Sequence, residues 1–282
     1  MVELQPLGTA GRGDAVPSLL SAYVALVRSR LSAQMVYRGS FAFEVGAQFG
    51  IGFVDFAEIY VVFHQVSSLG GFSFAEVAMM FALTTCAFSM ADMFVGHIDG
   101  LPNYVRTGQF DAMLLRPLSA LGQLVTSDFS LRRLGRAMTG LLVLGAALVF
   151  TDIDWTPARL LLLVITPVAG CAIFCAIFVA AAAVSFWLVE GTEFANAFTY
   201  GGNYLASLPF TIFHVAVQRF FTFVIPAAFV AYLPTLALLG RKDPTGLPGW
   251  LCWSGPVAAL IAAAAARLLW RNGLHHYVGA GS

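Results

Sequence analysis

Long runs of apolar residues are the feature that most constrains what this chain can fold into. Four of them begin near Phe41, Phe74, Leu160 and Trp250, a shorter one follows Leu134, and an irregular one fills 194–239. Each long run has the roughly 20 residues with which a helix crosses a hydrocarbon layer of about 30 Å. With 59% hydrophobic and 11% charged residues, the composition is also that of a membrane protein. We therefore expect an all-α integral membrane fold.

The runs predict six transmembrane helices. The spans are expected at about 41–63, 74–98, 134–151 and 160–189, as one crossing plus a broken or re-entrant element within 194–239, and at about 250–270. The fifth region is irregular because glycines and prolines interrupt it, at Gly201, Gly202, Pro209, Pro226 and Pro234. Such backbone is tolerated at membrane depth only where protein or water shelters it.

The chain before the first span is expected to differ from the rest. Residues 1–17 are rich in Gly and Pro, lack the basic start and apolar run of a signal peptide, and predict a flexible tail. From 18 to 38, apolar residues gather on one side of a helix, which predicts an N-terminal helix lying in the membrane interface. Residues 18–282 would then form one transmembrane domain.

The basic residues are distributed unevenly between the two sides of this predicted topology. If the N-terminus is cytoplasmic, eleven arginines fall on the cytoplasmic side: Arg12, Arg28, Arg30, Arg38, Arg106, Arg116, Arg132, Arg133, Arg136, Arg267 and Arg271. Only Arg159, Arg241 and Lys242 fall on the far side, and Arg219 is assigned to neither. Positively charged loop residues are enriched on the cytoplasmic side of membrane proteins, so both termini are predicted to be cytoplasmic.

The residue sets of enzymes and metal sites are missing from the sequence. There is no G-x-x-x-x-G-K-[ST] loop for nucleotide phosphates, no G-x-S-x-G and no H-E-x-x-H. Cys86, Cys171, Cys175 and Cys252 lie in apolar runs without a C-x-x-C or a neighbouring His pair. Because Cys behaves as a small apolar residue in such a setting, we expect no disulfide and no metal site. Because the motifs are missing, we expect no cofactor and no enzymatic activity in this chain.

Three acids lie within the first predicted span. Relative to Glu44, Asp55 lies at about 20° and Glu58 at about −40° around an ideal helix, so the three share one stripe. A charged side chain in hydrocarbon costs about 2.5 kcal/mol or more, which excludes lipid from that stripe. Two interpretations remain open. Either the acids line a passage or a subunit seam, or Glu44 lies near Arg38 at the inner interface while Asp55 and Glu58 reach water at the outer one.

Two further features of the spans predict packing. Gly46 and Gly50 form a G-x-x-x-G on the side of the first span nearly opposite the acids, where a neighbouring helix can approach closely. Asp92 lies in the second span near its cytoplasmic end, and we expect it to form a structural pair with an arginine.

A charged interval separates the second and third predicted spans. Within it, residues 103–115 can form a short helix that carries Tyr104, Phe110 and Leu114. Pro117 ends this helix, and Arg116 precedes the break. The pattern alone also permits an amphipathic helix that only lies in the inner membrane interface.

Three blocks of the sequence resemble one family of bacterial membrane proteins, the permeases of type-2 ATP-binding-cassette (ABC) exporters. The run "GQFDAMLLRPL" is similar to a family loop of the form G-x-[FL]-D-x-x-L-[LI]-R-P-L after the second span. The segment "FVIPAAFVAYLPTLALLG" resembles the proline-punctuated stretch before the last span, and "LLWRNGLHHYVGAGS" resembles the W-R-x-G-L-x-x-Y-x-[SG]-A-G ending. The resemblance extends from about residue 20 to the end.

The resemblance implies a half-transporter in the bacterial cell membrane, with six helices and both termini inside. It would form the translocation pathway with a second permease subunit, identical or paralogous. Separate ABC ATPase subunits would bind ATP and Mg²⁺ and supply the energy. The remaining contacts would be with the lipid bilayer, and none with nucleic acid.

By the same resemblance, residues 103–118 would be the coupling helix that docks into an ATPase subunit. Phe110 and Leu114 would form the buried anchor of that contact, and Pro117 would end the helix. Polar residues at the rim would fix its register, namely Arg106, Asp111 and Arg116.

An ion-coupled secondary transporter is the alternative from a different functional class. It would use Glu44, Asp55 and Glu58 to bind the coupling ion. Many carriers of that kind contain inverted repeats, and the sequence has no long internal repeat, which argues against this alternative.

Overall fold

The computed structural model describes residues 38–127, 130–188 and 191–277. The predicted flexible tail and the predicted interfacial helix lie outside these residues, apart from Arg38. In the described part, all regular structure is helical except for an isolated bridge between Leu69 and Phe72. The expected all-α fold is confirmed.

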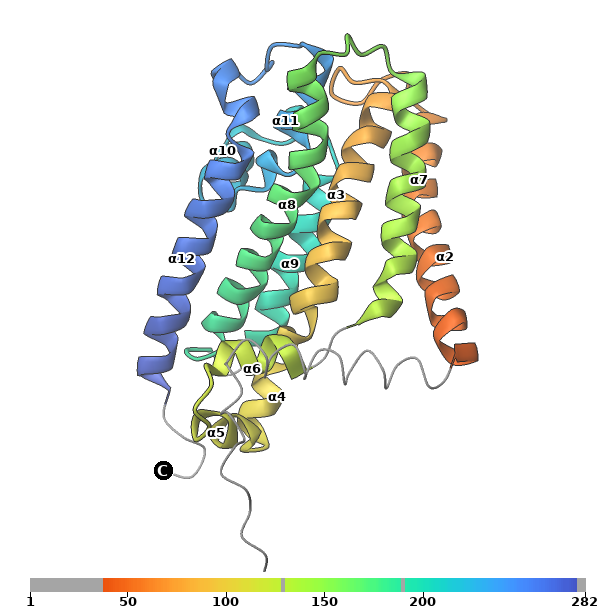
Figure 1. Ribbon diagram of the computed structural model, residues 1–282. Coiled ribbons are helices and arrows are strands. Elements are labelled where there is room, and N and C mark those ends of the chain that lie inside the picture. The colour runs from red at the N-terminus through yellow and green to blue at the C-terminus, as the bar shows by residue number, and fades with distance from the viewer. Residues whose placement is uncertain (1–37, 128–129, 189–190, 278–282) are drawn as a thin grey trace, which may run out of the picture.

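Among the described residues, five helices are long and apolar enough to cross a membrane. They are α2 (Arg38–Phe63), α3 (Phe74–Val95), α7 (Leu134–Phe150), α8 (Pro157–Val184) and α12 (Gly255–His276). A bent helix pair counts as a sixth candidate if it forms one span. Figure 1 shows the five helices running along one bundle, with the start of α2 and the end of α12 at the same end. The chain is a multi-pass membrane protein.

Two helix boundaries differ from the expected ones. α8 ends at Val184 instead of continuing to 189, and hydrogen-bonded turns follow it. α12 starts at Gly255 rather than near 250, because Gly249–Trp253 form a 3-10 turn, η5. A proline in the first turn of α12 suits this later start, since that position needs no backbone N–H donor.

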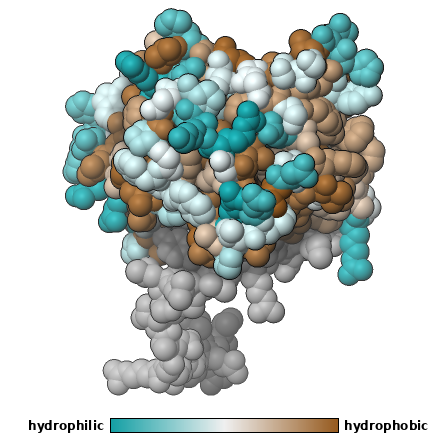
Figure 2. Space-filling model, turned by 90° about the horizontal axis from the view of Figure 1, so that it is seen from above, coloured by the Kyte–Doolittle hydropathy of each residue, from teal (hydrophilic) through white to brown (hydrophobic). Residues whose placement is uncertain are grey.

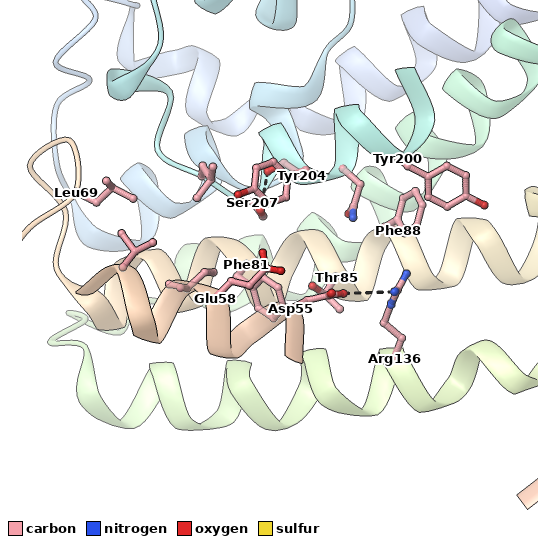
Figure 3. A pocket seen from close by; sticks show the side chains of 14 residues that line it. Asp55, Glu58, Leu69, Phe81, Thr85, Phe88, Arg136, Tyr200, Tyr204 and Ser207 are labelled. Carbon is pink, nitrogen blue, oxygen red and sulfur yellow. Dashed lines mark hydrogen bonds and ion pairs between the residues drawn. The ribbon is translucent and has the colours of Figure 1, made fainter. Parts of the chain in front are cut away.

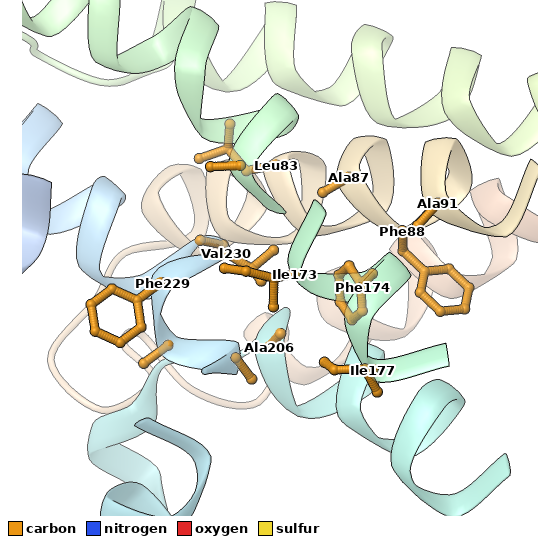
Figure 4. Close-up of a cluster of buried hydrophobic side chains, with 14 of the residues drawn as sticks. Leu83, Ala87, Phe88, Ala91, Ile173, Phe174, Ile177, Ala206, Phe229 and Val230 are labelled. Carbon is orange, nitrogen blue, oxygen red and sulfur yellow. The ribbon is translucent and has the colours of Figure 1, made fainter. Parts of the chain in front are cut away.

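α3 forms the centre of the bundle. In its most apolar stretch of 18 residues, 83% of the residues are buried within the protein, against 11% in the corresponding stretch of α2. Gly170 lets α8 approach α3 closely, because a Cβ atom at this position would lie 2.8 Å from Cβ of Ala87 in α3. Phe88 and Phe174 meet edge to face in this core, with ring centroids 5.1 Å apart (Figure 4).

α2 packs against α7 through glycines other than those that the sequence suggested. A Cβ atom at Gly135 of α7 would overlap the carbonyl oxygen of Val45, and one at Gly52 of α2 would lie 2.9 Å from a side chain of α7. At Gly46 and Gly50, no described atom of this chain lies within 4 Å of such a Cβ, local helix backbone aside. Within the described chain no neighbouring helix packs there, because α7 covers another side of α2, so close packing at these two glycines stays a prediction.

The interval between α3 and α7 is broken into short helices. They are η1 (Gly96–Gly100), α4 (Leu101–Arg106), α5 (Gln109–Leu114), α6 (Ala120–Ser127) and η2 (Leu131–Arg133). The single helix expected over 103–115 is wrong. Gly108 has a φ of +69°, a left-handed conformation that separates α4 from α5. Both helices protrude beyond one end of the bundle (Figure 1).

The irregular fifth region contains α9 and a bent helix pair. α9 (Gly191–Ala206) lies against α8. α10 (Val215–Phe223) then meets the stretch from η4 (Ala227–Phe229) through α11 (Tyr232–Leu239) at 75°. Residues 227–236 are all buried, so protein shelters this irregular backbone. The broken element expected here is present, at the end opposite α4 and α5 (Figure 1).

Side-chain contacts fasten the loops at that opposite end. Ser73 and Glu76 form a reciprocal cap at the start of α3. Glu76 also pairs with Arg241 at 2.9 Å, and the Arg241 guanidinium lies 4.9 Å from the ring centroid of Phe72. These contacts hold the loop after α11 against the loop before α3. Figure 2 looks onto this end, where polar and apolar side chains are mixed.

Candidate functional site

A pocket of about 240 Å³ lies between α2, α3, α7 and α9 (Figure 3). It sits toward the end opposite α4 and α5, since Leu69 from the loop after α2 and Leu208 from the end of α9 belong to its wall. The other lining residues are Asp55, Glu58, Ile59, Val62, Phe81, Thr85, Phe88, Arg136, Tyr200, Asn203, Tyr204 and Ser207. Charged, polar and aromatic side chains therefore face one space.

The structure brings two of the three stripe acids into this pocket. A carboxylate oxygen of Asp55 lies 3.3 Å from Nη2 of Arg136, which α7 contributes. Glu58 is exposed and forms no ion pair with any residue in the described ranges. Among the described residues that line the pocket, Arg136 is the only Lys or Arg, and with Asp55 and Glu58 it gives a formal charge of −1.

The third acid, Glu44, does not line the pocket. Its carboxylate lies 3.9 Å from Nη1 of Arg132, and both side chains are about half exposed, at 47% and 49%. An exposed pair at this distance contributes little stability. The structure therefore separates Glu44 from Asp55 and Glu58, although all three acids are on α2.

α9 supplies a wall that the sequence reasoning missed. Tyr200, Asn203, Tyr204 and Ser207 follow the i, i+3, i+4, i+7 spacing of one helix face. This spacing is present in the sequence and could have predicted the wall. The neighbouring Gly201, Gly202 and Pro209 instead suggested an irregular segment. Two polar groups of the lining are buried without a hydrogen-bond partner among the described residues, Oδ1 of Asn203 and Nε of Arg136.

A charged cluster continues from the pocket toward α4 and α5. Tyr200 interacts with both Arg133 and Asp99 through its hydroxyl, and Arg133 forms an ion pair with Asp92. The expected pairing of Asp92 with an arginine is thus confirmed. Figure 3 shows the hydroxyl of Tyr200 pointing away from the two pocket acids. One tyrosine therefore contributes to the pocket and to the cluster beside η1.

The protruding α4–α5 segment exposes a different set of residues from the expected one. Phe110 is 0% exposed and packs inside the chain, with ring centroids 5.1 Å from Tyr277 and 5.7 Å from Phe186. The prediction that Phe110 anchors an external contact is corrected, because its apolar face is turned toward the protein's own bundle. Leu114 and Leu115 are the apolar side chains at the surface, 44% and 88% exposed.

Asp111 also has an internal partner. Its Oδ1 accepts a hydrogen bond of 2.9 Å from the hydroxyl of Tyr277, but the residue is still partly exposed, so its place at a polar rim stays a prediction. Arg106, Arg116 and Pro117 are exposed, as a contact with another protein would require. Of the predicted coupling residues, those two arginines, Leu114 and Pro117 remain on the surface.

The C-terminal end of the described chain holds α5 in place. Tyr277 contacts α5 and also meets Phe186 at 5.7 Å, and Phe186 in turn meets Trp270 at 5.4 Å. Gly273 is needed beside this cluster, since a Cβ there would lie 2.5 Å from the Phe186 ring. Two of the sequence blocks that carried the resemblance, the one around Phe110 and the one ending the chain, therefore meet in space.

One of the comparisons with known proteins identifies a family. Residues 49–281 match the sequence model of a family described as ABC-2 family transporter protein. No curated protein and no solved structure is similar enough to count as a match. The matched region includes the pocket, the α4–α5 segment and the C-terminal residues that hold it. The chain therefore belongs to the ABC-2 transporter family and is a membrane permease.

Proposed function

We propose that this chain is the permease subunit of an ATP-driven exporter in a bacterial cell membrane. It forms the translocation pathway with a second permease, identical or paralogous, and separate ABC ATPase subunits bind ATP and Mg²⁺. The surface of the α4–α5 segment is the observation that carries this proposal. Membership of the ABC-2 family supports the association with ATPases and a transport function.

The exposed part of α4 and α5 suits docking to an ATPase subunit. Leu114 and Leu115 are exposed apolar side chains at the end of α5, and Arg106 and Arg116 are exposed on the same segment. A buried apolar centre with a polar rim is the usual arrangement of a protein contact. The segment lies beyond the bundle end rather than along its side, which favours a protein partner over the membrane interface (Figure 1).

The inner face of the same segment can transmit a displacement to the bundle. Phe110 contacts Phe186, two residues after the end of α8, and Tyr277, which directly follows α12. The first residue of α4, Leu101, is fully buried, and α4 follows α3 through η1. A push on α5 would therefore move α3, α8 and α12 together, as rigid elements do in transport cycles.

The face that carries α2 and α9 is where we place the second permease. Glu58 of α2 and Tyr204 of α9 are exposed there, and Asn203 is partly exposed. Carboxylate and amide groups are unfavourable in contact with lipid tails, so protein or water is expected to cover this face. In this arrangement α9 is the fifth crossing, the α10–α11 pair is re-entrant, and both termini are cytoplasmic.

The experiment tests the outer face of α5. The double variant Leu115→Asp and Arg116→Glu should abolish substrate-stimulated ATP hydrolysis by the reconstituted permease–ATPase complex, while the permease still elutes as a monodisperse peak. Lys242→Glu is the matched control, because it reverses an exposed charge at the opposite end of the bundle. Normal stimulation in the double variant would refute the docking site. Transport without any ATPase would instead favour an ion-coupled carrier.

A further inference from the structure

We propose that the pocket between α2, α3, α7 and α9 binds a small organic cation, a protonated amine attached to an aromatic or aliphatic body. This inference deepens the proposed function, since it assigns a substrate class to the pathway. It depends on three properties of the pocket: its charge, its aromatic walls and the unpartnered acceptor of Asn203.

The charge of the lining favours a cation. Arg136 is engaged with Asp55 at 3.3 Å, and Glu58 has no ion-pair partner among the described residues. A carboxylate at membrane depth is costly unless water or an opposite charge accompanies it. A cationic ligand would compensate Glu58, whereas an anion would be repelled by it. The pocket therefore selects by the sign of the charge.

The walls suit an apolar body beside that charge. Phe81, Phe88, Tyr200 and Tyr204 all face the pocket, and the rings of Phe88 and Tyr200 lie 5.6 Å apart. Aromatic faces attract ammonium groups and also bury apolar surface. A volume of about 240 Å³ equals about eight waters at about 30 Å³ each, which fits a compact amine and excludes a folded peptide.

One acceptor completes the site for a protonated amine. Oδ1 of Asn203 is buried without a hydrogen-bond partner in the described part of the chain. A buried acceptor left without a partner is unfavourable, so this oxygen is poised to accept a hydrogen bond from a ligand N–H group. Phenylalkylammonium ions have this combination of features.

The test uses three probes with the same phenyl body and different charge: 2-phenylethylammonium, 2-phenylethanol and phenylacetate. Their binding to the full-length permease in lipid nanodiscs would be measured by equilibrium dialysis. The cation should bind at least about tenfold more tightly than the alcohol, as expected for a charge-assisted contact, and phenylacetate should bind more weakly than both. Equal binding of cation and alcohol would overturn the proposal.

Variants separate this pocket from other acidic positions. Glu58→Gln keeps the shape of the side chain and should weaken cation binding at least about tenfold, with no effect on the alcohol. Glu44→Gln is the matched control, because it removes the same charge from the same helix outside the pocket, and should change nothing. Tyr204→Leu should weaken cation binding about threefold, since it replaces the aromatic face by an aliphatic one. Equal effects of the two glutamine variants would contradict the site.

The outcome can be distinguished from a failure of the proposed function. Association with the ATPase subunits and ATP hydrolysis are measured on the same preparations. An intact ATP-hydrolysing complex without charge-selective binding would overturn the pocket and leave the permease assignment standing. Charge-selective binding without ATPase association would support the pocket and overturn the assignment.

Discussion

Substitution Phe110→Ala should release α5 from the bundle without unfolding the bundle itself. The Phe110 ring is 0% exposed and meets the rings of Phe186 and Tyr277 at 5.7 and 5.1 Å. Truncation of a buried phenylalanine costs about 3–5 kcal/mol. α5 has only six residues, and hydrogen bonds from the Tyr277 hydroxyl to Asp111 and from the Gln123 side chain to the carbonyl of Met113 also hold it. The equilibrium between docked and undocked α5 should therefore shift roughly a hundredfold or more, because 1.4 kcal/mol is a factor of ten.

Amide hydrogen exchange followed by mass spectrometry measures this local opening directly. Peptides that cover α5 should lose protection, while peptides from α3 should keep it. Tyr277→Phe should give a smaller change of about tenfold, because it removes the hydrogen bond to Asp111 and keeps the ring. Leu115→Ala is the control, since that side chain is 88% exposed and should leave protection unchanged. Unchanged exchange of α5 in Phe110→Ala, or an equal loss in α3, would refute the reasoning.

Three further predictions concern topology and stability. In a background without native cysteines, Gln109→Cys should react with a membrane-impermeant maleimide only from the cytoplasm, and Asp154→Cys, 101% exposed at the other end, only from outside. Arg133→Met should lower the free energy of unfolding by about 3–5 kcal/mol, measured by thermal unfolding, because it leaves the buried Asp92 carboxylate unpaired. Gly135→Leu should separate α2 from α7 and reduce the yield of monodisperse protein in size-exclusion chromatography.

Each of these predictions has a result that would contradict it. Labelling of Gln109→Cys from outside would invert the topology. Arg133→Met with an unchanged melting temperature would show that the ion pair does not hold Asp92, whereas the added substitution Asp92→Asn should recover part of the loss. A normal yield of Gly135→Leu would mean that α2 and α7 are farther apart than the structure places them, and Gly46→Leu is the control that should be tolerated.

The spans could be predicted because their physical cause is local. The length of each apolar run and the positions of the arginines can be seen directly in the sequence. They are enough to predict the spans that α2, α3, α7, α8 and α12 form. The stripe of acids was also predictable, since helical geometry alone puts Asp55 and Glu58 on one side of α2. Local sequence did not show that Glu44 pairs with Arg132 outside the pocket, because that depends on where η2 lies.

The inner and outer faces of α5 could not be assigned from the sequence. From the sequence, Phe110 and Leu114 were both predicted to be apolar anchors of a contact with another protein. Only the fold shows that Phe110 is buried within this chain. The contact that encloses it, from Tyr277 to Asp111, joins positions 166 residues apart. Helical periodicity relates residues within one helix, so it cannot predict a contact between residues so far apart in the sequence. The C-terminal block was recognisable as a motif, but its role in holding α5 depends on the end of α12 reaching that helix.

Tyr200 connects two places where other molecules are expected to bind. Its ring belongs to the pocket, and its hydroxyl interacts with Arg133 and Asp99 beside the helices that lead to α5. If these contacts differ between the permease with and without a docked ATPase, ligand binding and ATPase docking are coupled. The coupling is reciprocal: a ligand that raises the affinity for the ATPase by some factor binds more tightly by the same factor when the ATPase is docked.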